Sequence, residues 1–367
     1  METWTAPQFD SYELWVAGIL IFVSGTLLTG AGLGGGAVFV SILITIMQMT
    51  AHEAVPNSKF IIFLSAIVTF ILNTAKAHKG NLIDFTLVRA IVPMSLAGTM
   101  LGILINTSAS EQVLFILLCC LMGALVLVSG RLAYVKIKEY QRTRVMVESV
   151  PEGTPNTFGN PSDLLVEPVT PDLIEIQQFT IRDKRNGLLF GLLPVVIAAG
   201  IVSKTASVPS GVRWTLFGLA ITACFGCAVV FHFWDAKNRP PLAYPLVGIA
   251  GGICSGLFGI GGGLIYAPFM LHMGLDSEVA VAVSSTCVLF ASASTSLQYL
   301  FTGRVAVLLG LFLAVFGIAS SISAAFTTRA LMRVTKRPYV VHVIVACAVT
   351  LSAIVTVVET VLEFKNN

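Results

Sequence analysis

The chain has 367 residues, of which 56% are hydrophobic and only 11% are charged, and its formal net charge is +3. Soluble domains carry about 25% charged residues, so this composition excludes a soluble globular protein and indicates a helical membrane protein. The basic residues lie in short loops between apolar runs, so nucleic acid is not expected as a partner.

Twelve apolar segments follow one another along the chain. They span residues 13–31, 34–50, 55–75, 86–106, 111–131, 186–203, 212–234, 242–259, 262–275, 278–301, 304–328 and 338–362. Most are long enough to cross the bilayer core, and the strict alternation of a β-barrel is missing. The expected fold is an all-α polytopic membrane protein with about 12 transmembrane segments.

Two glycine cassettes stand in corresponding places of this pattern. The first is Gly32-Leu33-Gly34-Gly35-Gly36, and the second, 227 residues later, is Gly259-Ile260-Gly261-Gly262-Gly263. Each cassette introduces a short segment, 34–50 or 262–275. The same separation aligns Ser58 with Ser285 and Ser65 with Ser292. Short, glycine-interrupted segments in corresponding positions are typical of transporter repeats with broken helices.

The cassettes have two interpretations. Small residues allow close helix packing in lipid. Alternatively, unwound backbone exposes N–H groups that bind an anion, and the repetition favours this function. The candidate backbone ligands are Gly34, Gly35, Gly36, Gly261, Gly262 and Gly263. The first cassette also fits a dinucleotide-binding pattern, but a membrane-length apolar run replaces the strand that such a site needs, so no cofactor is expected.

A polar patch follows each short segment. Asn57 or Ser58, just after Pro56, is expected to cap the next helix and to aim donors at a pocket under the cassettes. Lys59 is either a functional cation at membrane depth or a lysine whose side chain reaches the surface. The candidate side-chain ligands are Asn57, Ser58, Lys59, Ser284, Ser285, Thr286 and Gln298.

The polar stretch 132–185 separates the two halves of the chain. Its first part, Ile137 to Val150, is compatible with an extension of the preceding helix, and the rest is typical of a flexible tether, with a regulatory or partner-binding role left open. Its Lys and Arg residues place it in the cytoplasm and both termini on the other side. The first cassette helix then starts from outside and the second from inside, which predicts two inverted-topology repeats.

The expected organisation therefore has four parts. Residues 1–131 form the first transmembrane repeat, 132–185 the cytoplasmic linker, 186–241 a connecting helix pair and 242–367 the second repeat. No catalytic motif is visible, and all seven cysteines lie inside apolar runs, so neither an enzyme nor a metal site is expected. The spans contain almost no acidic residues, which argues against a cation pathway.

The chain resembles the TauE/SafE sulfite exporter family, especially its eukaryotic members, over residues 14–131 and 242–360. The resemblance rests on Gly32 to Val40 followed by Ala54 to Phe60, on Gly256 to Leu264 followed by Ser284 to Thr286 and by Gln298-Tyr299, and on the long hydrophilic loop. Pro56-Asn57 departs from the serine- or threonine-rich patches of many relatives, so the first site is expected to be tuned differently.

This resemblance implies a secondary transporter for sulfite, sulfonates or related small sulfur-containing anions. The implied partners are an inorganic or organosulfur anion, the lipid bilayer, and a coupling proton or other ion. Two alternatives stay open: a passive anion channel, and a non-transporting receptor or scaffold that acts through residues 132–185.

Overall fold

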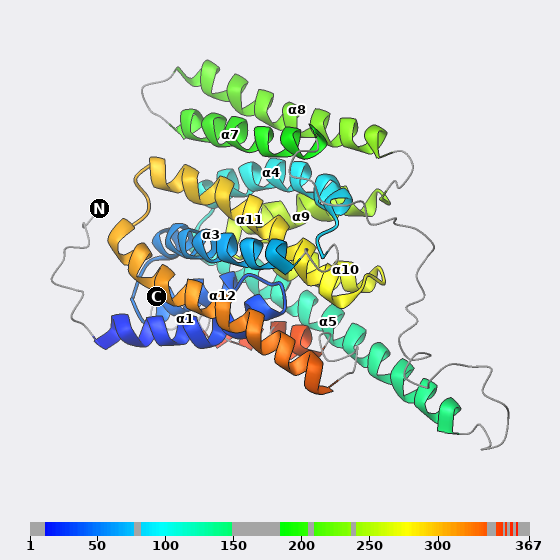
Figure 1. Cartoon of the computed structure of the whole chain (residues 1–367). Helices are drawn as coiled ribbons and strands as arrows, with labels where there is room; N and C mark the ends of the chain where they lie inside the picture. Colours follow the sequence, from blue (N-terminus) through cyan, green and yellow to red (C-terminus); the bar gives the residue numbers. More distant parts are fainter. Residues whose placement is uncertain are drawn as a thin grey trace.

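The computed structural model describes residues 12–76, 82–148, 184–204, 209–235 and 240–335, with short pieces between 343 and 358. All regular structure in these residues is helical (Figure 1). The helices of the first half are α1 (Tyr12–Gly30), α2 (Gly36–Thr45), α3 (Ala51–Lys76), α4 (Phe85–Ser108) and α5 (Glu111–Glu148). Those of the second half are α7 (Lys184–Lys204), α8 (Ser210–Trp234), α9 (Ala243–Phe258), α10 (Gly263–His272), α11 (Ser277–Phe301) and α12 (Val307–Thr335).

Eight of the described helices are long and apolar enough to cross a membrane, namely α1, α3, α4, α5, α7, α8, α11 and α12. This confirms a multi-pass helical membrane protein. Helices α2 and α10 have 10 residues each, so each is only about 15 Å long, half of the hydrocarbon core. The twelfth predicted segment, 338–362, lies largely outside the described residues.

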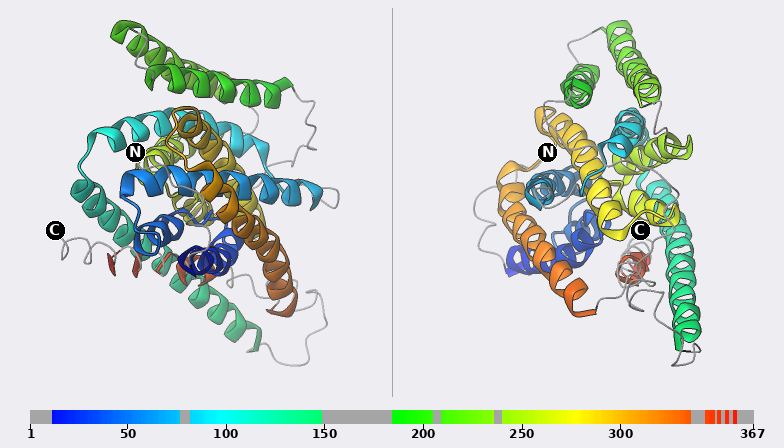
Figure 2. Two further views of the ribbon diagram at one scale, coloured as in Figure 1. Left: turned by 90° about the vertical axis from the view of Figure 1, so that its left-hand side faces the viewer. Right: turned by 45° about the vertical axis from the view of Figure 1, so that its right-hand side comes forward.

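The helices of the two halves pack against each other in a reciprocal pattern. Helix α4 packs along α9 and α12 packs along α1, while α3 contacts α12 and α11 contacts α4. Because the 227-residue separation pairs α1, α2 and α3 with α9, α10 and α11, each of these contacts has an equivalent in the other half. Each half therefore completes the core of the other, and the two are intertwined (Figure 2).

Helices α3 and α11 lie side by side at the centre and run antiparallel. Asn73, near the end of α3, donates a hydrogen bond from its amide to the hydroxyl of Ser285, near the start of α11, at 3.1 Å. Asn57, near the start of α3, accepts one from the N–H of Ala306, which follows the end of α11, at 3.1 Å. The equivalent helices α3 and α11 thus point in opposite directions.

Helices α7 and α8 form a pair at the edge of the molecule, next to α4 and α11 (Figures 1 and 2). A buried ion pair fastens them to the core. The Arg89 guanidinium, on the first turns of α4, binds both carboxylate oxygens of Asp235 at 3.0 and 2.9 Å. It also donates to the side-chain oxygen of Asn186 at 2.9 Å, and Arg185 reaches Asp235 at 3.2 Å. The cluster joins the start of α4 to the start of α7 and the end of α8.

The predicted cap at Asn57 or Ser58 is wrong, because α3 begins earlier, at Ala51, and Pro56 lies inside it. The helix is started by a capping box instead. The backbone N–H and the hydroxyl of Thr50 both donate to the carboxylate of Glu53, at 3.2 and 3.1 Å. At the other end of this half, α5 continues to Glu148, which confirms the expected helical start of the polar stretch.

Candidate functional site

The two cassettes adopt the same backbone conformation. The φ angles of Gly32, Gly34 and Gly35 are 75°, 74° and 75°. Those of their equivalents in the second cassette, Gly259, Gly261 and Gly262, are 75°, 77° and 75°. Side chains are disfavoured in this left-handed region, so glycine is required at these positions. The cassettes end α1 and α9 and place the first turns of α2 and α10 immediately after them.

The cassettes also contact each other reciprocally. A Cβ atom on Gly36 would lie 2.5 Å from the carbonyl carbon of Ile260, and one on Gly263 would lie 2.7 Å from the carbonyl oxygen of Gly32. Close packing is therefore one role of these glycines, and it brings the N-terminal ends of α2 and α10 together. Such ends carry partial positive charge and free N–H groups, which attract anions.

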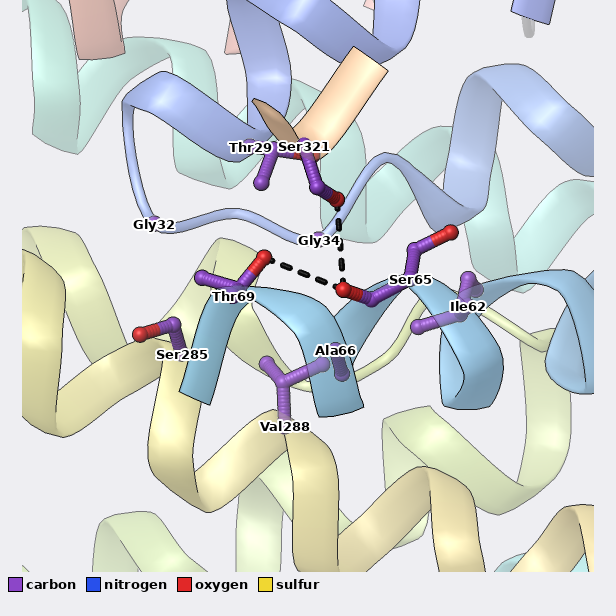
Figure 3. Close-up of a pocket in the computed structure, with 10 residues that line it drawn as sticks. All are labelled: Thr29, Gly32, Gly34, Ile62, Ser65, Ala66, Thr69, Ser285, Val288 and Ser321. Atoms are coloured by element: carbon purple, nitrogen blue, oxygen red, sulfur yellow. Dashed lines mark hydrogen bonds between the residues drawn. The ribbon is translucent and has the colours of Figure 1, made fainter. Parts of the chain in front are cut away.

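A small pocket with several hydroxyl groups in its lining lies beside the first cassette, between α3, α11 and α12 (Figure 3). Its lining residues are Thr29, Gly32, Gly34, Ile62, Ser65, Ala66, Thr69, Ser285, Val288 and Ser321. Five of these side chains carry hydroxyl groups, and none is charged. The pocket leaves about 10 Å³ for the centre of a water molecule, which is the room that about one bound water needs.

The pocket hydroxyls are held by backbone carbonyl groups. Ser65 donates to the carbonyl of Ile61 at 2.7 Å, and Thr69 donates to that of Ser65 at 3.1 Å. Ser285 donates to the carbonyl of Ala282 at 3.0 Å while it accepts from Asn73. Bonds from a hydroxyl to the preceding turn are easily exchanged by rotation about χ1. These hydroxyls can therefore turn to donate to a ligand that bears negative charge.

Among the predicted ligands, Gly34 and Ser285 line this pocket. Ser284 lies against the cassette itself, since its hydroxyl donates to the carbonyl of Gly32 at 2.8 Å. The N–H groups of Gly34 and Gly35 have no hydrogen-bond partner in the described residues, so they stay available to a ligand. Of the other predicted glycines, Gly36 and Gly263 lie where the two cassettes meet. Gly261 faces Val288 and Ile62 of the pocket lining, and Gly262 packs on Tyr266.

The remaining polar candidates have partners elsewhere in the protein. Asn57 holds the start of α12 through Ala306. Ser58 donates to the carbonyl of Val55 at 2.9 Å, and a Cβ on Gly259 would lie 3.0 Å from its hydroxyl oxygen. Thr286 donates to the carbonyl of Ala282 at 2.8 Å.

Gln298 lies apart from the pocket lining, near the end of α11. It donates to the Ser294 hydroxyl at 3.2 Å and packs against Gly200 of α7.

Lys59 is completely buried, so its side chain does not reach the surface. Its ammonium group donates to the hydroxyl of Ser255 at 2.5 Å. Ser255 belongs to the last turn of α9, where the carbonyl ends of the helix favour a positive charge. No acidic side chain bonds to Lys59 within the described residues. This lysine is therefore a buried donor beside the second cassette, and its protonated form has two further N–H groups to offer.

The prediction from sequence missed four polar side chains of the pocket: Thr29, Ser65, Thr69 and Ser321. Ser65 carried a signal, because it matches Ser292 at the repeat separation, and Thr69 likewise matches Ser296. Thr29 and Ser321 carried none. Ser321 reaches the pocket because α12 packs on α3, where its hydroxyl donates to the carbonyl of Ser65 at 3.2 Å. The described residues contain no cluster of His, Cys, Asp and Glu that could hold a metal ion.

Comparison with known proteins shows what the chain is similar to. A family model described as "Sulfite exporter TauE/SafE" matches residues 16–158 and 176–355. Sulfite exporter TauE/SafE family protein 1 of Arabidopsis thaliana is 23% identical over 334 residues, which cover 78% of this chain and 70% of that relative. Family protein 3 of the same plant is 24% identical over 387 residues, or 95% of this chain and 79% of the relative. No solved structure matches the chain.

Proposed function

Because the chain belongs to the sulfite exporter TauE/SafE family, we propose that it is a secondary transporter that moves sulfite, a sulfonate or a related small sulfur-containing anion by alternating access. The observation that carries the proposal is the pair of reciprocally packed glycine cassettes beside a pocket with several hydroxyl groups in its lining. Transporters of this kind bind their substrate where broken helices from two repeats meet.

The two repeats are proposed to be inverted in the membrane. The antiparallel course of α3 and α11 supports this, because both helices are long enough to cross the bilayer. Two repeats related in this way can exchange conformations, which opens the site first to one side and then to the other. The proposed organisation keeps the four parts expected from the sequence, with the linker cytoplasmic and both termini on the opposite side.

The proposed substrate site combines backbone and side-chain donors. The N–H groups of Gly34 and Gly35 and the hydroxyls of Ser65, Thr69 and Ser285 would bind the oxygen atoms of the anion. The pocket accommodates about one water molecule, so α11 or the cassette must move before sulfite fits. We propose that this narrow pocket represents one state of the cycle, and that the Lys59 ammonium group, bonded to Ser255, supplies positive charge beside the second cassette.

Sulfite flux into proteoliposomes that contain the purified protein tests this proposal. We expect saturable uptake of labelled sulfite. We also expect labelled sulfite inside the vesicles to exchange with unlabelled sulfite outside. Replacing the pocket hydroxyl in Ser285→Ala removes a bond to a charged ligand, worth about 1.5–3 kcal/mol, so the half-saturating concentration should rise at least about tenfold. Thr222→Ala, on the exposed face of α8, is the matched control and should behave like the natural protein.

Three results would contradict the proposal. Flux no greater than in empty liposomes would remove sulfite as the substrate. Electrical currents far above transporter turnover would identify an anion channel instead. Equal half-saturating concentrations for Ser285→Ala and the natural protein would remove this pocket from the pathway.

A further inference from the structure

The hydroxyl-bearing residues of the pocket beside the first cassette have counterparts in the second half of the chain. The repeat separation of 227 residues carries its hydroxyl-bearing residues Ser65 and Thr69 onto Ser292 and Ser296, and Ser58 onto Ser285. The same separation relates the contacts of the two cassettes. For example, Gly35 packs on Phe39 in the first half, and Gly262 packs on Tyr266 in the second. At these two glycines the correspondence holds in space as well as along the chain.

The two sets of residues differ in burial in one consistent direction. Ser65 and Ser285 are 6% and 7% exposed, whereas their equivalents Ser292 and Ser58 are both 0% exposed. Gly34 and Thr69 are partly exposed, but Gly261 and Ser296 are buried. The first set, Ser65, Thr69 and Ser285, thus lines a partly open pocket. The second set, Ser292, Ser296 and Ser58, is closed.

The closed set contains a hydroxyl group without a partner. The Oγ atom of Ser296 is buried and has no hydrogen bond in the part of the chain that the structure describes. Its equivalent, Thr69, donates to the carbonyl of Ser65. The corresponding acceptor for Ser296, the carbonyl of Ser292, already accepts from Thr295 at 3.2 Å. A buried hydroxyl without a hydrogen bond is energetically unfavourable, so this one is poorly satisfied unless something binds to it.

The charge next to the closed set favours an anion. Ser58 is followed by Lys59, whose ammonium group is fixed on Ser255 one turn before the second cassette. The residue that corresponds to Lys59 beside the open pocket is the neutral Thr286. A buried cation near hydroxyl donors would repel a metal ion and attract a small oxyanion.

We propose that Ser58, Ser292 and Ser296 form a second anion-binding site, which opens to the opposite side of the membrane when the pocket at Ser65, Thr69 and Ser285 closes. This inference rests on the proposed transport function and adds to it a second set of ligands. Sulfite passes from one set to the other across the cassette pair. During transport, the partly open pocket closes as its closed counterpart opens, so that the two sets of residues exchange their states.

Accessibility of introduced cysteines from each side of the membrane tests the second site. Thr69→Cys and Ser296→Cys are each treated with a membrane-impermeant thiosulfonate from one face or the other of sealed vesicles. Modification is assigned by peptide mass spectrometry, because the chain has seven cysteines of its own. Ser129→Cys, on α5 and also buried, is the matched control and should stay unmodified from both faces.

We expect Thr69→Cys to react from one face only and Ser296→Cys from the opposite face only. Saturating sulfite on one side shifts the population of the two states, so it should change the two rates in opposite directions, by about tenfold each. Ser296→Ala, which keeps the packing if the cysteine variant fails to fold, should raise the half-saturating sulfite concentration from that second face alone.

Reaction of Ser296→Cys from the same face as Thr69→Cys would overturn the second site. So would its failure to react from either face in vesicles that transport sulfite. In both cases the proposed function stands without it. Opposite-face labelling in a protein that moves no sulfite would instead keep the second site and remove sulfite as the cargo.

Discussion

Gly36 and Gly263 are the residues at which each cassette abuts the backbone of the other. A methyl group on either would collide with backbone atoms, which cannot move aside as a flexible side chain can. We therefore expect Gly36→Ala to destabilise the protein by about 1–3 kcal/mol through overpacking, read as a lower thermal unfolding midpoint in detergent.

Gly226→Ala is the matched control, because a Cβ atom there meets nothing within 4 Å. It should leave the midpoint unchanged or raise it, since alanine is favoured over glycine in a helix by about 0.5–1 kcal/mol. Equal midpoints for the two variants would show that the cassettes are not tightly packed in solution.

Substitution of Lys59 is expected to affect the stability of the protein and its transport function in different ways. Its buried ammonium group is bonded to one hydroxyl, so Lys59→Met, which keeps the length of the side chain, should preserve or raise the unfolding midpoint. Sulfite uptake should fall by about tenfold or more, because the anion loses its buried counter-charge. The exposed Lys138→Met is the control. A variant with normal uptake would assign Lys59 a purely structural role.

Among single residues, the repetition of glycines and hydroxyl side chains at one separation was the feature of the sequence that indicated the site. It located both cassettes and Ser285, because glycines and hydroxyls recur at one separation. It could not locate Ser321, which enters the pocket from a helix of the other half. Nor could it show that Asn57 binds the start of α12, since that bond joins residues 249 positions apart.

At the scale of elements, helix boundaries follow local chemistry that the sequence does contain. Thr50 and Glu53 are spaced as a capping box, which begins α3 before Pro56. A later start was predicted because Asn57 and Ser58, residue types that commonly cap helices, stand just after Pro56. The broken helices were predicted correctly, because left-handed glycines cannot continue a helix.

The edge pair α7–α8 depends on its ion pair with α4. Removing one partner in Arg89→Met leaves the buried carboxylate of Asp235 with Arg185 alone, so we expect a loss of about 3–5 kcal/mol. Hydrogen exchange should rise in α7 and α8 before it rises in α3. A double-mutant cycle with Asp235→Asn isolates the pair. Additive effects of the two substitutions would show that the ion pair does not hold the helices together.

At the scale of the whole molecule, the intertwined packing makes the halves depend on each other. Helix α4 is covered by α9, and α1 is covered by α12, so neither half alone buries the apolar surface of all its helices. The sequence predicted two repeats but not that they are interlocked, because contacts between distant helices leave no periodic pattern in either helix alone.

This dependence predicts the behaviour of a chain that is cut in two. Polypeptides divided within residues 149–183 should fold together when they are expressed together, because the described helices of the two halves make extensive contacts with each other. Each half expressed alone should be degraded. The pair should copurify and retain sulfite flux in proteoliposomes, which would also count against a scaffold acting through residues 132–185. Loss of flux in a copurifying pair would show that transport needs this stretch to be continuous, and a stable single half would refute the interdependence of the repeats.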